Sequence, residues 1–410
     1  MSSTPSTSAA SSTHHGSHLG KVLGVSLIAA IVVSIFVLAF SWPTKTSETH
    51  NLPVSVAGPQ QAVDQFESKI KEKSGDTFDF VEADSRDQAV DQIKHRETYG
   101  AIILAEQPKT PEVLTAPAAN ATATQILKGM GDQLTTQMRG QISGQVQQMQ
   151  AKSGGNLSPE QAKQALAMEQ KAATAEVPVT EVVPLSDDDP NGAGLTAAAF
   201  PLVLGGMIGG VLITFLVKGV WRRLIASVAY GALAGLSLTL ILHTWFGFVE
   251  GNFGLLWLAF GLSAMATATF ILGCTAILGA PGIGIGALVT LLIGNPLSGA
   301  TAAWQFMAEP WGHIGQFLVP GASNTLLRSV SYFPDAPTAQ QWWTLIAWVA
   351  LGVVLTSIGH FRHNSINEDE PASEPSEHDG HDENRVTSGD YHAPRHLKTS
   401  ENERPSGAQA

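Results

Sequence analysis

A long polar segment separates the first apolar run of this chain from all the others, and this layout limits the fold more than any other feature. The first apolar run covers residues 22–40, a polar stretch follows over residues 42–195, and closely spaced apolar runs then continue to residue 361. A helix that crosses a bilayer needs about 20 predominantly apolar residues. The layout therefore predicts an integral membrane protein with one large polar domain on one side of the membrane.

Six segments qualify as candidate spans, one before the polar domain and five after it: residues 22–40, 198–217, 224–245, 255–274, 283–293 and 343–359. The fifth segment is short and rich in glycine, with small residues on both sides. Ala39 to Ser41 loosely resemble a signal-peptide cleavage site, but the apolar region of a signal peptide has only about 7–15 residues. Residues 22–41 are therefore predicted to form an uncleaved transmembrane helix.

The basic residues of the short loops indicate the orientation, because Lys and Arg are enriched on the cytoplasmic side of membrane proteins. Lys218, Arg222 and Arg223 lie between the second and third candidate spans, so this loop is predicted to be cytoplasmic. Both termini then lie in the cytoplasm, and residues 42–195 are extracellular. We expect a multi-pass protein of the plasma membrane.

The terminal segments are polar and differ from the apolar middle of the chain. Residues 1–21 are rich in Ser and Thr, and residues 364–410 contain eleven Asp or Glu against four Lys or Arg, so the tail supplies much of the net charge of −12. Segments of such composition bury too little apolar surface to fold. We predict a disordered cytoplasmic N-terminus and a disordered acidic cytoplasmic tail over residues 363–410, and we expect no nucleic-acid partner.

The polar domain, residues 42–195, alternates strand-like and helix-like patterns. Strands are predicted at residues 53–57, 78–82 and 99–104, with helices at residues 60–73 and 85–95 between them. Such a βαβαβ unit implies a small, mostly parallel sheet covered by helices, and residues 177–184 could return as another strand. Residues 118–171 form a helical extension with a thin apolar seam. This extension is either an external stalk or dimer contact, or a helix packed along its own domain.

These patterns together predict an α-helical polytopic membrane protein with six spans and an external α/β domain that carries the helical extension. The five later spans lie within residues 196–362. They include an unusual external loop at residues 295–341, which is too apolar for an ordinary loop and too broken by proline to span the membrane. Short amphipathic helices at the outer interface and a re-entrant pair buried against the bundle both fit this loop.

The membrane region carries few groups with chemical reactivity. From residue 224 to residue 327, Glu250 and Glu309 are the only Asp, Glu, Lys or Arg residues, and both fall in predicted external loops. A proton-driven antiporter needs a titratable group inside the membrane, so this class is disfavoured. Cys274 is the sole cysteine, and the sequence contains no Walker A, HExxH or nucleophile-elbow motif. We predict no enzyme activity, no catalytic residue, no cofactor and no metal site.

Glycines gather on two of the membrane segments instead. They form two overlapping GxxxG pairs in one segment and a further pair in the next: Gly205, Gly206, Gly209, Gly210, Gly231 and Gly235. Small residues at this spacing let helices approach one another closely. They predict close contacts within the bundle or between the subunits of a homo- or heterodimer.

Three stretches of the chain follow a known family pattern. The first, in the external domain, contains Ser85, Asp87, Ala89, Ile93, Gly100 and Ala101; the second begins at Leu185 and the third at Asn295. They resemble membrane subunits of type-2 ABC exporters, particularly the phage-infection-protein-like branch of Gram-positive bacteria, over most of residues 20–360. The resemblance implies a six-helix permease with its external domain between the first two spans, and ATP hydrolysis on a separate chain.

The sequence departs from this family at the N-terminus. Such permeases often carry an amphipathic cytoplasmic helix before the first span, whereas residues 1–20 have no apolar face. Our first hypothesis is the permease of an ABC-type export system that moves an amphipathic or lipid-like substrate outward, with a partner ATPase contacting Lys218, Arg222 and Arg223. The alternative is a non-transporting membrane scaffold or surface accessory protein for secretion or envelope assembly.

Overall fold

The computed structural model describes residues 16–46, 50–104, 110–154, 157–300 and 303–368. The described residues up to residue 365 belong to one compact unit. The disorder predicted for residues 1–15 and 369–410 falls outside the described residues. Helix α1 (Gly16–Thr46) and helix α12 (Ala339–Glu368) both continue past the boundaries that the sequence predicts at residues 21 and 363.

The polar domain is built on a five-stranded sheet with the order β2-β1-β3-β4-β5. Its strands are β1 (Leu52–Ala57), β2 (Phe78–Ala83), β3 (Gly100–Ile103), β4 (Glu112–Thr115) and β5 (Val179–Glu181). Strands β2, β1 and β3 are parallel, β4 pairs antiparallel with β3, and β5 pairs parallel with β4. The predicted parallel unit and the returning strand are confirmed. The sequence analysis does not predict β4.

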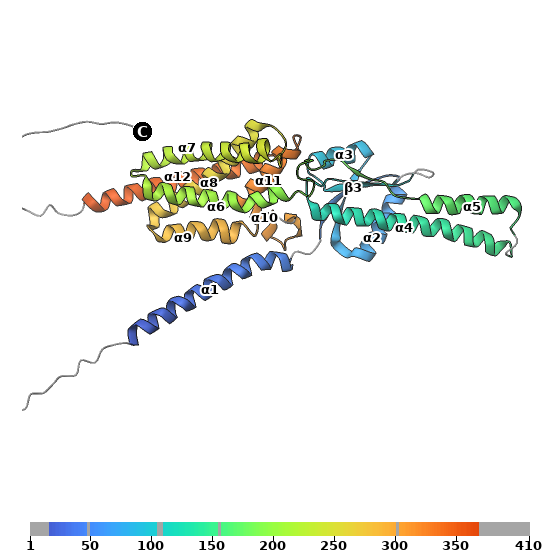
Figure 1. The fold of residues 1–410 in the computed structure, drawn as a ribbon, viewed down its shortest axis with the longest axis horizontal. Helices are drawn as coiled ribbons and strands as arrows, with labels where there is room; N and C mark the ends of the chain where they lie inside the picture. Colours follow the sequence, from blue (N-terminus) through green and yellow to red (C-terminus); the bar gives the residue numbers. More distant parts are fainter. Residues whose placement is uncertain (1–15, 47–49, 105–109, 155–156, 301–302, 369–410) are drawn as a thin grey trace, which may run out of the picture. The chain divides into compact units, whose positions relative to one another are not determined.

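Helices cover both faces of this sheet (Figure 1). Helix α2 (Gln60–Ser74) links β1 to β2, and α3 (Arg86–Lys94) links β2 to β3. These two crossovers run in opposite directions along the sheet, so right-handed connections place their helices on opposite faces. Ser55 of β1 donates a hydrogen bond of 2.6 Å to Gln92 of α3. Helix α3 therefore covers one face, and α2 shares the other with α4.

The first part of helix α4 (Ala121–Lys152) packs on the sheet, and its later part packs on a second helix. Leu127 lies against Gly100 of β3, and Gly131 approaches Val179 of β5. Beyond this region α4 pairs with α5 (Pro159–Thr174), whose first turn is closed by a capping box at Ser158. Both helices lie side by side in Figure 1. One end of the extension therefore packs along its own domain, and the remainder forms a helical hairpin.

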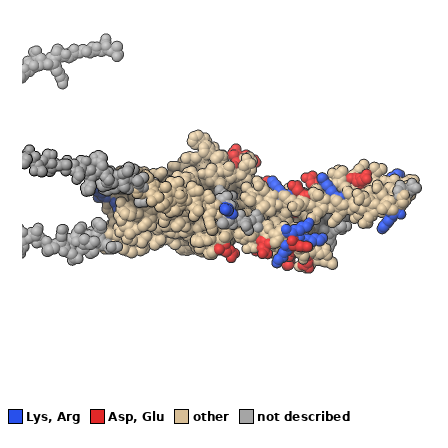
Figure 2. All heavy atoms as spheres, turned by 90° about the horizontal axis from the view of Figure 1, so that it is seen from below, with Lys and Arg blue, Asp and Glu red and all other residues tan. Residues whose placement is uncertain are grey.

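Among the residues that the structure describes, four helices are long and apolar enough to cross a membrane: Ala193–Leu216 (α6), Val220–Trp245 (α7 and the π-helical turn η2), Phe253–Leu278 (α8) and Ala339–Phe361 within α12. They match the predicted second, third, fourth and sixth spans. Two shorter apolar stretches, Ala30–Trp42 of α1 and Pro281–Gly294, correspond to the first and fifth. Figure 2 shows charged side chains gathered over the sheet domain and the hairpin, while the membrane helices present a broad uncharged surface.

The six-span layout is therefore not confirmed by helix length. Residues 281–294 form α9 (Pro281–Ala287) and the π-helical η3 (Leu288–Gly294). Fourteen residues at about 1.5 Å per residue reach about 21 Å, less than the roughly 30 Å of a hydrocarbon core. This segment packs closely on α8, because Gly282 rests on the backbone of Cys274 and Gly286 on Ile271.

The described part of the loop after η3 contains two short α-helices, α10 (Trp311–Gln316) and α11 (Val319–Tyr332). Helix α11 is buried on nearly all sides and contacts α6, α8, α10 and η3. An amphipathic helix at the interface would keep one face exposed, so α11 matches only the burial against the bundle that the second alternative describes. The re-entrant pair itself is not confirmed. Trp311 and Ile314 of α10 remain exposed.

The glycines of α6 and α7 are used for contacts inside the chain. A Cβ atom on Gly206 would lie 2.6 Å from Thr267 of α8, and one on Gly235 would lie 2.6 Å from the backbone of Trp257. Tyr230 of α7 packs over Gly209 and donates a hydrogen bond of 2.5 Å to the carbonyl of Gly205. Contacts within the bundle, one of the two predicted uses of these glycines, are confirmed.

Candidate functional site

The predicted cytoplasmic contact lies in the turn between α6 and α7, where the three basic residues come together. Lys218 and Arg222 are exposed. Arg223 instead donates hydrogen bonds of 2.8 and 2.9 Å to the carbonyl oxygens of Val217 and Thr214 at the end of α6. A guanidinium at this position satisfies carbonyls that the helix leaves unpaired. Arg223 therefore fixes the turn, whereas the side chains of Lys218 and Arg222 remain exposed.

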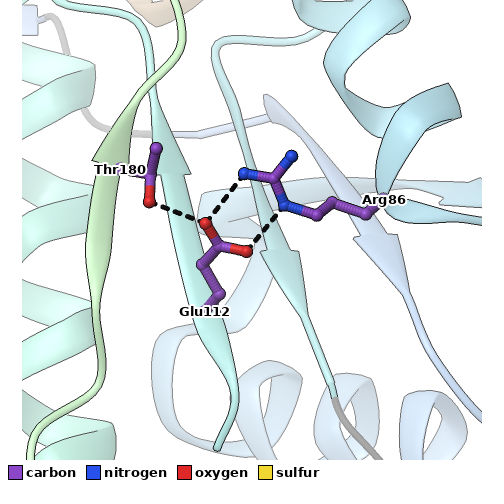
Figure 3. A network of polar contacts seen from close by, with 3 residues as sticks. All are labelled: Arg86, Glu112 and Thr180. Carbon is purple, nitrogen blue, oxygen red and sulfur yellow. Dashed lines mark hydrogen bonds and ion pairs between the residues drawn. The ribbon is translucent and has the colours of Figure 1, made fainter.

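A second candidate site is the junction between the sheet domain and the membrane helices. It begins with α3, whose first turn is fixed to the sheet (Figure 3). Arg86 forms a bidentate pair with Glu112 of β4 at 2.8 and 2.9 Å, and Thr180 of β5 donates to the same carboxylate at 2.6 Å. Hydrogen bonding to Arg86 lowers the pKa of Glu112. The network thus joins α3 to β4 and β5. These are the two strands that the sequence pattern defines least clearly.

The turn that follows α3 binds α11. Arg96 has a positive φ of 60°, and its guanidinium donates hydrogen bonds of 3.0 Å to the carbonyl of Thr325 and 2.7 Å to the hydroxyl of Ser329. The guanidinium also lies 5.4 Å from the ring centroid of Phe333, within cation–π distance. One arginine therefore makes three contacts with a segment more than two hundred residues away in the sequence.

Two further hydrogen bonds cross the junction. Arg328 of α11 donates a bond of 2.9 Å to the carbonyl of Ala118, just before α4. Tyr99 donates a bond of 2.8 Å to the side-chain oxygen of Gln305. Three segments of the sheet domain are thus joined to the loop between η3 and α12.

Arg328 is buried in the junction, and Arg96 is partly buried. Burial lowers the pKa of Arg96, and it lowers that of Arg328 to about 10, with the charge of Arg96 acting in the same direction. Arg328 therefore stays protonated at neutral pH. In the described part of the chain, the ion pairs within 4.0 Å are Arg86–Glu112 and Lys128–Glu181, so neutral oxygens, not carboxylates, hold the two guanidinium groups.

The start of α6 is fixed by an acidic cap. Both carboxylate oxygens of the buried Asp189 accept backbone N–H groups, from Ala193 at 2.9 Å and Gly194 at 2.7 Å. Ser186 and Tyr332 donate bonds of 2.6 Å to the carbonyls of Gly247 and Phe248 in the loop before α8. An acidic residue before an apolar run is an ordinary helix-start signal. The sequence therefore contains a local signal for the start of α6.

The described residues contain no cluster of three or more His, Cys, Asp or Glu side chains suited to a metal ion. Cys274 is a buried free thiol. What the arrangement provides is a mechanical connection between a polar domain and an apolar bundle.

The fold and its junction define a helical membrane protein with an α/β domain inserted between its first and second apolar helices. Residues 21–359 match the family described as ABC-2 family transporter protein. The chain belongs to this family and is a membrane component of an ABC transporter. No curated protein and no solved structure showed a significant similarity to the chain.

Proposed function

We propose that this protein is the permease of an ABC-type export system, in the phage-infection-protein-like branch, that moves an amphipathic or lipid-like substrate outward across the plasma membrane. The observation that carries the proposal is the family match over residues 21–359. It is supported by a bundle whose core helix, α8, contains no charged residue. Such a bundle offers an apolar path and no proton relay, so the energy for transport would come from a separate ATP-binding subunit.

The proposed ATPase contact is the exposed pair Lys218 and Arg222 in the α6–α7 turn. Arg223 has a positioning role, because its guanidinium is already bound to the end of α6. The test is co-purification of the tagged full-length protein with an ATP-binding protein from its own host. The K218E/R222E variant should lose the ATPase, since two cations become two anions on an exposed turn.

The matched control is Lys163→Glu and Lys171→Glu, a double charge reversal on α5 of the sheet domain, which should leave co-purification unchanged. Equal recovery of the ATPase with both double variants would remove the α6–α7 turn as its contact. If the unmodified protein recovers no ATPase in any detergent or in nanodiscs, the export proposal itself fails.

A dimer is also proposed, built on the outer faces of the glycine-rich helices. The glycines face inward, whereas Trp221, Ile225, Val228 and Leu233 of α7 are exposed. These side chains meet either lipid or a second subunit. Measuring the mass of the protein in nanodiscs distinguishes a monomer surrounded by lipid from a dimer.

The alternative function is a membrane scaffold or surface accessory protein for secretion or envelope assembly. The observation that favours it is the polar sequence before α1, which has no apolar face for docking an ATPase. A scaffold would retain its partners after loss of the α6–α7 charges and would not stimulate ATP hydrolysis.

A further inference from the structure

A cleft with a volume of about 650 Å³ opens beside the junction. Its walls come from both parts of the molecule: α3 and the segment after β5 on one side, and the start of α8, the end of α11 and the start of α12 on the other. The volume lies within the roughly 300–1,000 Å³ of small-molecule sites, which occur preferentially between domains. The cleft lies on the same end of the membrane helices as the sheet domain.

The lining combines an apolar body with a charged rim. Leu255, Val330 and Trp342 supply apolar and aromatic surface from three helices, α8, α11 and α12. Such a lining suits a ligand with an apolar body, and the indole ring of Trp342 can also face a cation. Phe333 also lines the cleft, but it is buried and its ring already faces the guanidinium of Arg96.

Three exposed charged residues line the rim of the cleft: Lys94, Glu250 and Asp335. Two carboxylates and one ammonium group leave one negative charge. Neither carboxylate takes part in the ion pairs found within 4.0 Å among the described residues, which are Arg86–Glu112 and Lys128–Glu181. Arg96 and Arg328 do not line the cleft, and they donate to oxygens of α11 and Ala118. The rim is therefore complementary to a single positive charge.

We propose that this cleft binds a small amphipathic cation, with its apolar body on Trp342, Leu255 and Val330 and its positive group toward Glu250 and Asp335. The inference goes beyond the proposed export function, because binding here requires neither an ATPase nor transport. It holds for a permease and for a scaffold alike.

The test uses the full-length protein in nanodiscs and two probes of the same shape and opposite charge, tetraphenylphosphonium and tetraphenylborate. Binding is measured by equilibrium dialysis against empty nanodiscs. The phosphonium should bind saturably, and about tenfold more tightly than the borate, because two carboxylates act at short range in a partly desolvated cleft. Equal affinities, or uptake no greater than that of empty nanodiscs, would overturn the proposal.

Substitutions locate the binding. The E250Q/D335N variant should weaken phosphonium binding about tenfold and leave borate binding unchanged or tighter. Glu309→Gln removes an exposed carboxylate from the same external loop outside the cleft and should change neither. Trp342→Ala should weaken both probes, since it removes apolar surface. Phosphonium binding that is the same in E250Q/D335N as in the unmodified protein contradicts the assignment, and because both residues are exposed, a folding defect is not expected to interfere.

Discussion

Single polar side chains join parts of this protein that lie far apart in the sequence. Arg96 and Arg328 connect the sheet domain to α11, and Asp189 holds the start of α6. Glu112 accepts hydrogen bonds from both Arg86 and Thr180. Most of these bonds use backbone carbonyls or N–H groups as partners, whereas Glu112 is part of a true ion pair. The contribution of the Arg86–Glu112 ion pair to stability should therefore depend on pH.

Glu112→Gln should loosen β4 and β5 at neutral pH. The pKa of Glu112 is lowered in the folded state, chiefly by its hydrogen bond to Arg86. The stabilisation is therefore present above the unfolded-state pKa of about 4.3 and is lost as pH falls through the lowered folded-state value. Because Arg86 is 44% exposed, we expect only about 0.5–1 kcal/mol at pH 7. Amide hydrogen exchange of β4 and β5 in the full-length protein measures this change.

The matched control for this prediction is Glu181→Gln, which breaks the more exposed Lys128–Glu181 pair and should have a smaller effect. The difference between Glu112→Gln and the unmodified protein should become smaller as the pH falls below about 4.3, the unfolded-state pKa. A difference of the same size at pH 3 and pH 7 would show that the ion pair is not its source.

At the scale of single elements, small residues decide how closely the membrane helices approach. Gly231 and Gly235 place α7 against the backbone of α8, and Gly352 places α12 against the same helix. Helix α8 is the most buried of the candidate spans. Its neighbours can pack on it only where no Cβ atom intervenes, so the glycine positions set the geometry of the bundle.

Gly235→Ala should lower the thermal stability of the protein in detergent. The added Cβ would lie 2.6 Å from backbone atoms of Trp257 and Gly261, which cannot turn aside as a side chain can. We expect a loss of about 1–3 kcal/mol. Gly284→Ala on α9 is the control, because nothing lies within 4 Å of its added Cβ, and it should be neutral or slightly stabilising. Similar melting temperatures for the two variants would contradict this packing.

Several elements could be predicted from sequence because their signals are local. Ser85 begins α3 as expected, and its hydroxyl accepts the N–H of Gln88 at 3.2 Å. The strands around Val54 and Ile102 follow from short apolar runs between helices. The sequence left the burial of α11 open as one of two alternatives, since Ser323, Asn324 and Arg328 add polar residues to an otherwise apolar loop. Its environment is supplied by α6, α8 and η3, which the local pattern does not contain.

At the scale of the whole molecule, the junction decides whether the sheet domain and the membrane helices move together. Arg96→Ala removes two hydrogen bonds to α11 and the contact with Phe333. We expect a loss of about 2–4 kcal/mol from the contact between the two parts. Faster hydrogen exchange should appear in α11 and in residues 96–100 together.

The control for this junction prediction is Glu97→Ala, an exposed neighbour of Arg96, which should leave α11 protected. Ser329→Ala should reproduce part of the Arg96→Ala effect, and the double variant should be less than additive, because both changes break the same hydrogen bond. Unchanged exchange of α11 in Arg96→Ala would show that the junction does not depend on this residue.

The orientation of the protein is a prediction at the same scale. In a Cys274→Ala background, Lys163→Cys on α5 should react with a membrane-impermeant maleimide on intact cells. Lys218→Cys should react only after permeabilisation, because the α6–α7 turn is predicted to be cytoplasmic. Both positions are exposed, so accessibility of the side chain does not differ between them. The opposite labelling pattern would reverse the topology.

The sequence by itself determined the membrane class, the insertion of an α/β domain after the first apolar segment, and most of its strands and helices, because hydropathy and short-range periodicity are local properties. Only the tertiary structure decided that the fifth apolar segment is a short helix packed on α8, that the glycines face inward, and that Arg223 fixes a turn. It also brought Arg96 to α11 and formed a cleft from five separate segments. These features depend on contacts between different elements, such as Arg96 and Thr325, which lie 229 positions apart, and such contacts leave no periodic pattern in the sequence.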